Sequence, residues 1–124
     1  MEKTKDIEYE LGGIKRVFRL HAVKYKDLCA MRDAINRSVA LQTDGVSAVS
    51  SVIISSIEMI NAQTEQSMGY CKAEELEALI DDGFALYDLI CRAIEFQSTF
   101  CNAYPKSREL ISVIQSYVCA GSME

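Results

Sequence analysis

Two glycines, Gly12 and Gly13, separate two short segments in which apolar and polar residues alternate. Such alternation is typical of half-buried strands, and a Gly-Gly dipeptide supplies the positive φ values of a two-residue hairpin turn. The pattern therefore predicts a β-hairpin over residues 5–20. Its second strand alternates at Ile14, Arg16, Phe18 and Leu20. In the register that the turn sets, apolar residues face each other and opposite charges face each other. The predicted pairs are Leu11 with Ile14, Glu10 with Lys15, Ile7 with Phe18, and Asp6 with Arg19.

After the hairpin, apolar residues recur at the three- and four-residue spacing of amphipathic helices. In the first helix the predicted core stripe is Leu28, Met31, Ile35 and Val39. Asp82 is a candidate N-cap for the fourth helix, and the polar residues 63–70 predict a loop. The spacing predicts helices over about 23–41, 46–62, 72–81, 84–101 and 108–119.

We therefore predict an α+β fold that is predominantly α-helical, in which an N-terminal two-stranded β-hairpin precedes about five helices packed as a small bundle. The chain has 124 residues, of which 49% are hydrophobic, which is enough for one core. We expect residues 1–124 to form a single domain with a helical region over 23–120. The tail, 121–124, is expected to fray.

The segment 46–62 is nearly uncharged, because Glu58 is its only charged residue. An apolar stripe is flanked by serines, which can be buried against a neighbour at lower cost than charged side chains. The stripe is either the face of a central core helix or a surface for a partner or another copy of the chain. The β-branched run 52–54 leaves a strand possible, although helical spacing over four turns favours a helix. The candidate surface residues are Val46, Val49, Val52, Ile53, Ile57 and Ile60.

Composition excludes several classes of protein. The longest charge-free run is too short and too rich in serine to span a membrane, and the charged N-terminus is unlike a signal peptide. We therefore expect a soluble cytoplasmic protein. A net charge of −5 without a run of Lys or Arg disfavours nucleic-acid binding. Residues 1–37 carry a net charge of +3 and residues 38–124 a net charge of −8, which favours contacts within the chain or between copies.

No pattern of residues predicts a reaction. His21 is the only histidine, and no serine or cysteine lies in a nucleophile motif. The five cysteines lack the close spacing of a zinc or redox site, so we interpret them as reduced structural thiols. The acidic stretch from Glu74 to Asp82 lacks the ligand order of a calcium loop. We therefore predict a protein with no enzymatic activity, no metal and no cofactor.

The order of the predicted elements resembles that of a known family. A hairpin with the sequence IEYELGGIKRVFRL precedes a helix beginning KYKDLCAMRDAI, and an acidic KAEELEALIDDG segment leads into FALYDLICRAIE. Over roughly residues 5–100 this resembles the tail assembly chaperones of long-tailed bacteriophages and their prophage relatives. The family pattern EELxxLID…xxLxxxIxxA is matched here by Glu75, Leu76, Leu79, Ile80, Asp81, Leu86, Ile90 and Ala93.

The resemblance implies a non-enzymatic protein that binds the long helical tape-measure protein during tail assembly, and that contacts the tail-tube subunit and further copies of itself. Two other functions remain open. One is a structural subunit of the phage tail or a head-completion subunit, and the other is a small cytoplasmic regulator that acts by binding a protein.

Overall fold

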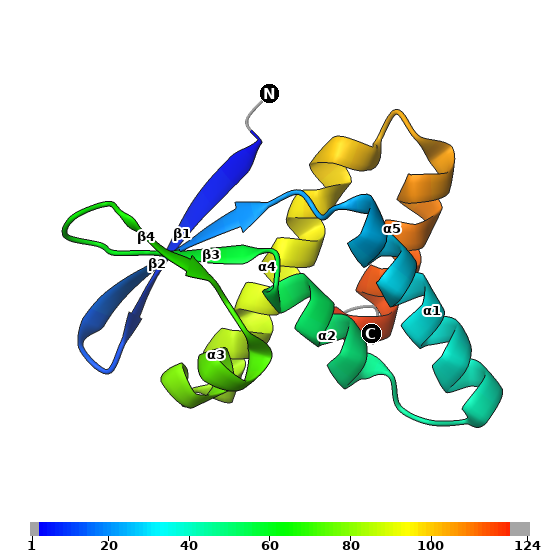
Figure 1. Ribbon diagram of the computed structural model, residues 1–124, viewed down its shortest axis with the longest axis horizontal. Coiled ribbons are helices and arrows are strands. Elements are labelled where there is room, and N and C mark those ends of the chain that lie inside the picture. The colour runs from blue at the N-terminus through cyan, green and yellow to red at the C-terminus, as the bar shows by residue number, and fades with distance from the viewer. Residues whose placement is uncertain (1–2, 120–124) are drawn as a thin grey trace.

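The computed structural model describes residues 3–119, which form a four-stranded sheet and five helices (Figure 1). The elements are β1 (Thr4–Leu11), β2 (Ile14–His21), α1 (Tyr25–Leu41), α2 (Val46–Ile54), β3 (Ile57–Ile60), β4 (Ser67–Tyr70), α3 (Ala73–Leu79), α4 (Gly83–Cys101) and α5 (Pro105–Cys119). The predicted frayed tail at 121–124 lies outside the described residues.

The sheet is antiparallel, with the strand order β1-β2-β3-β4. Gly12 and Gly13 have φ values of 60° and 81° and form the predicted turn. Arg19 donates two hydrogen bonds to the Asp6 carboxylate, of 2.8 and 3.1 Å. The predicted hairpin register is confirmed at Leu11 with Ile14, Glu10 with Lys15, Ile7 with Phe18, and Asp6 with Arg19.

The predicted helix over 46–62 is wrong in its second half. α2 ends at Ile54, and residues 57–60 form β3 along the second edge of β2. The hydroxyls of Ser55 and Ser56 donate to carbonyl oxygens of the last helical turn, at 2.6 and 2.7 Å. Such bonds compete with continuation of a helix, and the added strand pairs an edge of β2 that a lone hairpin would leave open.

The predicted loop over 63–70 is also wrong, because it contains β4, which pairs with β3 across an irregular register. The Asn61 side chain accepts hydrogen bonds from two backbone N–H groups and shapes the turn between the strands. Gly69 has a φ of 96°, which only glycine adopts easily, and this position allows the irregularity. The predicted fold class is therefore corrected from a two-stranded hairpin on a helical bundle to a four-stranded antiparallel sheet beside five helices.

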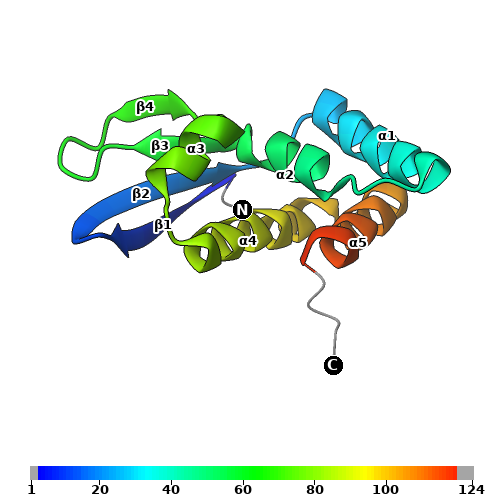
Figure 2. The same ribbon diagram turned by 90° about the horizontal axis from the view of Figure 1, so that it is seen from below.

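The longer helices form two layers beside the sheet (Figure 2). α1 packs against α2 in one layer, α4 against α5 in the other, and α2 contacts both α4 and α5. The predicted N-cap of α4 is confirmed, because Asp82 accepts hydrogen bonds from the N–H groups of Phe84 and Ala85. Fully buried side chains from both the sheet and the helices join in one core. They include Phe18, Met31, Ile53, Leu89, Ile94 and Ile114.

The predicted stripe of α1 is correct at Met31 and Ile35 and wrong at Val39, which is 70% exposed. Ser38 is buried in its place. Its hydroxyl donates to a carbonyl oxygen within α1 and lies 2.8 Å from the Tyr117 hydroxyl. A polar contact with α5 therefore decides which side of the last turn of α1 faces the core.

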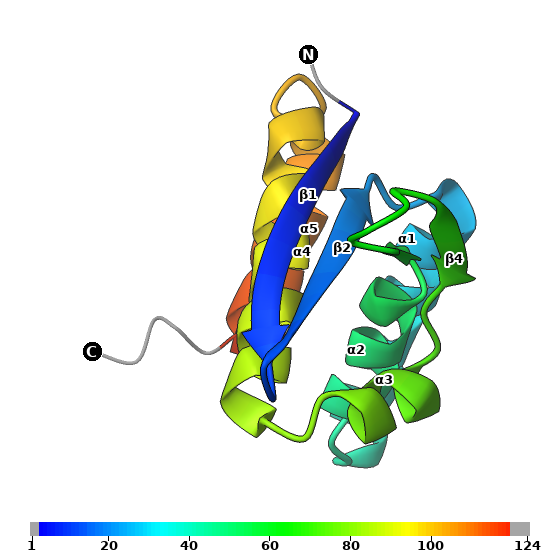
Figure 3. The same cartoon turned by 90° about the vertical axis from the view of Figure 1, so that its left-hand side faces the viewer.

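Hydrogen bonds fasten the sheet to α4, which runs behind β1 in Figure 3. The Tyr9 hydroxyl donates to the Asp88 carboxylate at 2.6 Å, and Arg92 lies both against that carboxylate and over the Tyr9 ring. Gln97 is 3% exposed; its amide donates to the His21 carbonyl at the end of β2 and accepts from the Val23 N–H in the β2–α1 connection. These contacts fix the distance between the hairpin and the helices.

Candidate functional site

The six residues of the sequence-predicted partner surface lie in or beside the core. Val49 and Ile53 are buried on α2, and Ile57 and Ile60 are buried on β3. Val46 and Val52 are half-buried. Because the six residues belong to a helix and a strand, they form no single face, and their burial favours the core interpretation over an exposed surface.

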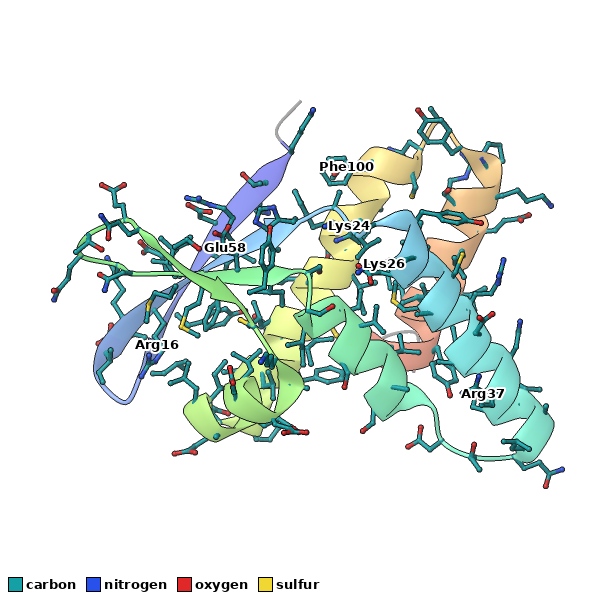
Figure 4. All side chains as sticks on the ribbon, in the orientation of Figure 1. Arg16, Lys24, Lys26, Arg37, Glu58 and Phe100 are labelled. Atoms are coloured by element: carbon teal, nitrogen blue, oxygen red, sulfur yellow. The ribbon has the colours of Figure 1, made fainter. Side chains whose placement is uncertain are left out.

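An exposed apolar groove lies elsewhere, between the tip of the β1–β2 hairpin, β4 and α3. Two hollows of about 280 and 270 Å³ meet there, and both are lined by Arg16, Met59 and Met68. Figure 4 shows Arg16 on the hairpin side of the molecule, toward α3. The other main apolar side chains of the groove are Ile14, Leu76 and Leu79.

Strand alternation explains why this groove is apolar. Ile14 and Arg16 lie four and two residues before Phe18, so all three side chains point to the same face of the sheet. α4 covers that face around Phe18, which is fully buried. The hairpin tip and the β3–β4 loop project beyond the first turn of α4 (Figure 2). Ile14 is therefore left 55% exposed, and Met68 on β4 is 61% exposed.

Arg16 is the polar group at the centre of the groove. Its Nε atom is buried and has no hydrogen-bond partner within residues 3–119. Arginine is always charged, and a buried donor without a partner is costly. The other charged residues that line the two hollows are Lys15, Lys72 and Glu75. The groove therefore has a net charge of +2, although the whole chain has a net charge of −5.

Cys71 lies in the wall of the groove, and burial raises the pKa of its thiol to about 11, with a smaller contribution from Glu75. The thiol is therefore protonated at neutral pH, and a protonated thiol is a weak nucleophile and a poor metal ligand. Within residues 3–119, no three His, Cys, Asp or Glu side chains lie close enough to hold a metal ion.

The opposite face of the sheet carries ion pairs. His21 Nε2 lies 2.9 Å from Glu58 Oε1. Hydrogen bonds from Ser67 and then from His21 lower the pKa of Glu58, and the hydrogen bond from Arg19 lowers the pKa of Asp6. His21 also lies against the Tyr70 ring, and it lines a hollow of about 270 Å³ together with Ser55 and Ser56, whose hydroxyls donate to carbonyl oxygens of α2.

A larger hollow of about 570 Å³ lies over this second face, between the hairpin and the β3–β4 loop. It is lined mainly by polar and charged residues, and several of these are already paired. Asp6 binds Arg19, and Glu8 lies 3.6 Å from Lys15. A polar hollow in which several charges are already paired offers a partner less than the Arg16 groove, where an apolar floor surrounds an unpaired cation.

Residues 3–119 therefore form an α+β structure with an exposed apolar groove at the hairpin end. No helix within residues 3–119 is both long and apolar enough to cross a membrane. Comparison of the sequence with models of protein families and with curated proteins, and of the fold with solved structures, found no match.

Reasoning from the sequence missed Arg16, Met59 and Met68 as members of a site. One signal was present, because Arg16 stands in phase with the apolar residues of β2 and is the only charged residue in that series. Met59 and Met68 carried no such signal, because one was assigned to a helix and the other to a loop.

Proposed function

We propose that this protein is a non-enzymatic phage tail assembly chaperone that holds an apolar segment of the tape-measure protein in the Arg16 groove. The observation that carries the proposal is the exposed apolar floor of the groove, in which Met59 and Met68 stand between the hairpin and α3. The resemblance of residues 5–100 to that family supports the identity of the client.

Methionine suits a chaperone groove because its side chain is unbranched and polarizable and adapts to differently shaped apolar partners. An amphipathic client helix would place its apolar face in the groove, as in other helix-in-groove complexes. A tape-measure protein is long, so several copies of the chaperone could bind along one client, and each contact can be weak.

The test is a pull-down with the tagged protein from cells in which the parent phage or prophage assembles tails, followed by mass spectrometry. We expect the wild-type protein to capture the tape-measure protein and Met68→Asp to lose it. Met68 is 61% exposed, so this change leaves the core intact. The matched control is Val113→Asp, which alters a half-exposed apolar residue on α5, away from the groove, and should keep the client.

Mass spectrometry of purified virions completes the test. A chaperone is absent from finished particles, whereas a structural subunit of the tail or head remains in them. Presence in virions, or capture of the client by Met68→Asp at the wild-type level, would overturn the proposal.

A further inference from the structure

We infer that the groove recognises an apolar protein segment that carries a carboxylate, and that this carboxylate pairs with the guanidinium of Arg16. The inference rests on the proposed function and specifies the chemistry of the client segment. It follows from three features of the groove: the buried unpaired donor, the excess of positive charge and the apolar surroundings.

The first feature is the donor itself. The Nε atom of Arg16 is buried without a partner within residues 3–119, and no carboxylate there lies within 4.0 Å of the guanidinium. The cross-strand neighbour of Arg16 is Tyr9, whose hydroxyl is already committed to Asp88. Any group that accepts from Arg16 must therefore come from another molecule or from outside the described residues, and a planar carboxylate matches the geometry of a guanidinium.

The second feature is charge. Lys15 and Lys72 line the groove together with Arg16, whereas Glu75 is the only acidic residue in its lining. Lys15 also lies 3.6 Å from Glu8, so the positive charge that no acid of residues 3–119 pairs is that of Arg16 and Lys72. Glu75 forms no ion pair with Arg16 in this structure. An acidic ligand would therefore be attracted to the groove although the whole protein is acidic.

The third feature is the apolar floor around Arg16. Met59 lies on β3, and Met68 and Leu79 reach the groove from β4 and α3. A segment that fills the groove would displace water from these side chains and from the guanidinium at once. A buried charge without its partner is strongly destabilising, so the carboxylate has to be buried together with the guanidinium. The acid must therefore lie within the apolar stripe of the ligand rather than at its edge.

A pair of synthetic peptides tests the inference. Both are fluorescently labelled amphipathic helices of 18 residues with a leucine stripe and neutral residues elsewhere. One has a glutamate at the centre of the stripe and the other has glutamine. Fluorescence anisotropy measures their binding to the full chain. We expect the wild-type protein to bind the glutamate peptide at least ten times more tightly than the glutamine peptide.

The variants assign the preference to Arg16. Arg16→Gln should reduce the preference for glutamate to less than twofold, whereas Arg16→Lys should keep part of it because the charge remains. The matched control is Arg32→Gln on the exposed surface of α1, which should keep the full preference. Circular dichroism of each variant shows whether the fold is retained. The preference of the wild-type protein for the glutamate peptide is measured without any variant, so it tests the inference even if a variant does not fold.

Three outcomes would overturn the inference. If the wild-type protein binds both peptides equally, the groove binds apolar segments but does not recognise a carboxylate. The proposed chaperone function is then tested by the pull-down alone. If the preference persists in a folded Arg16→Gln protein, another cation recognises the acid. If neither peptide binds and Met68→Asp still captures the client, both the inference and the groove assignment fail.

Discussion

Replacing Ile53 with alanine measures how far the apolar residues of α2 contribute to the core. Ile53 is 0% exposed and lies on the helix that contacts α1, α3, α4 and α5. Truncation of a fully buried isoleucine removes its transfer free energy and leaves a cavity, at a cost of about 2–5 kcal/mol. Because α2 is enclosed by four helices that cannot all move inward, we expect a loss of about 3 kcal/mol in the free energy of unfolding.

Thermal and urea unfolding followed by circular dichroism measure this loss. A chain of 124 residues has an unfolding entropy of about 0.26 kcal/mol/K near its midpoint, so a loss of about 3 kcal/mol lowers Tm by about 12 °C. The matched control is Val39→Ala on α1. Val39 belongs to the predicted apolar stripe of that helix but is 70% exposed, so its truncation should change stability by less than about 0.5 kcal/mol.

The comparison has a clear refuting result. A loss below about 1 kcal/mol at Ile53, or an equal loss at Val39, would show that the α2 stripe is not the packed interior described above. It would then restore the interpretation of the stripe as a surface that a partner covers.

Three further predictions concern polar and glycine positions. Gly45→Ala should destabilise the fold by about 1–3 kcal/mol in urea unfolding, because the new Cβ would lie 2.9 Å from the Tyr117 hydroxyl; wild-type stability would refute this close approach. Gln97→Met should cost about 1–3 kcal/mol, since it leaves the part-buried N–H of Val23 without its acceptor; a variant of wild-type stability would show that water replaces the amide. The lowered pKa of Glu58 contributes stability that is present above its ordinary value of 4.5 and is lost as the pH falls through the lower folded value. Glu58→Gln should therefore flatten the acid limb of the stability profile, and an unchanged limb would contradict the assignment.

The hairpin could be predicted from the sequence because all of its information is local. The turn glycines set the register, and alternation set the faces, so the pairing of Ile7 with Phe18 followed without knowledge of any other element. The cap at Asp82 and the positions of α1, α3, α4 and α5 were predicted for the same reason, within a few residues at each end.

The second half of the sheet could not be predicted, because it depends on a distant partner. Residues 57–60 continue the helical spacing of α2 closely enough to be assigned to it, and only the open edge of β2, some forty residues earlier in the sequence, makes a strand more favourable. β4 follows from β3 in turn. Its sequence, Ser-Met-Gly-Tyr, has no alternation and a central glycine, so its assignment needs the neighbouring strand.

The same dependence hid the candidate site. Whether an apolar residue is core or surface depends on what covers it, and the α2 stripe was covered by α4 and α5 while the tip of β2 was not. Val49 and Met68 are both apolar residues beside serines in the sequence, yet one is fully buried and the other is 61% exposed. Arg16 was visible as a charged residue in an apolar phase, but alternation alone cannot distinguish a cation that finds a carboxylate within the fold from one that does not.

The position of Arg16 also links stability to binding. The structure keeps a buried guanidinium donor unpaired, which costs folding free energy that an uncharged side chain of similar size would recover. Arg16→Met should therefore raise Tm, because the methionine side chain has no donor to leave unpaired and fits the apolar floor. The same change should weaken the binding of the glutamate peptide, because it removes the positive charge. Thermal unfolding and anisotropy on the same protein measure both effects. A variant that loses stability as well as binding would show that Arg16 supports the fold, and would contradict this prediction.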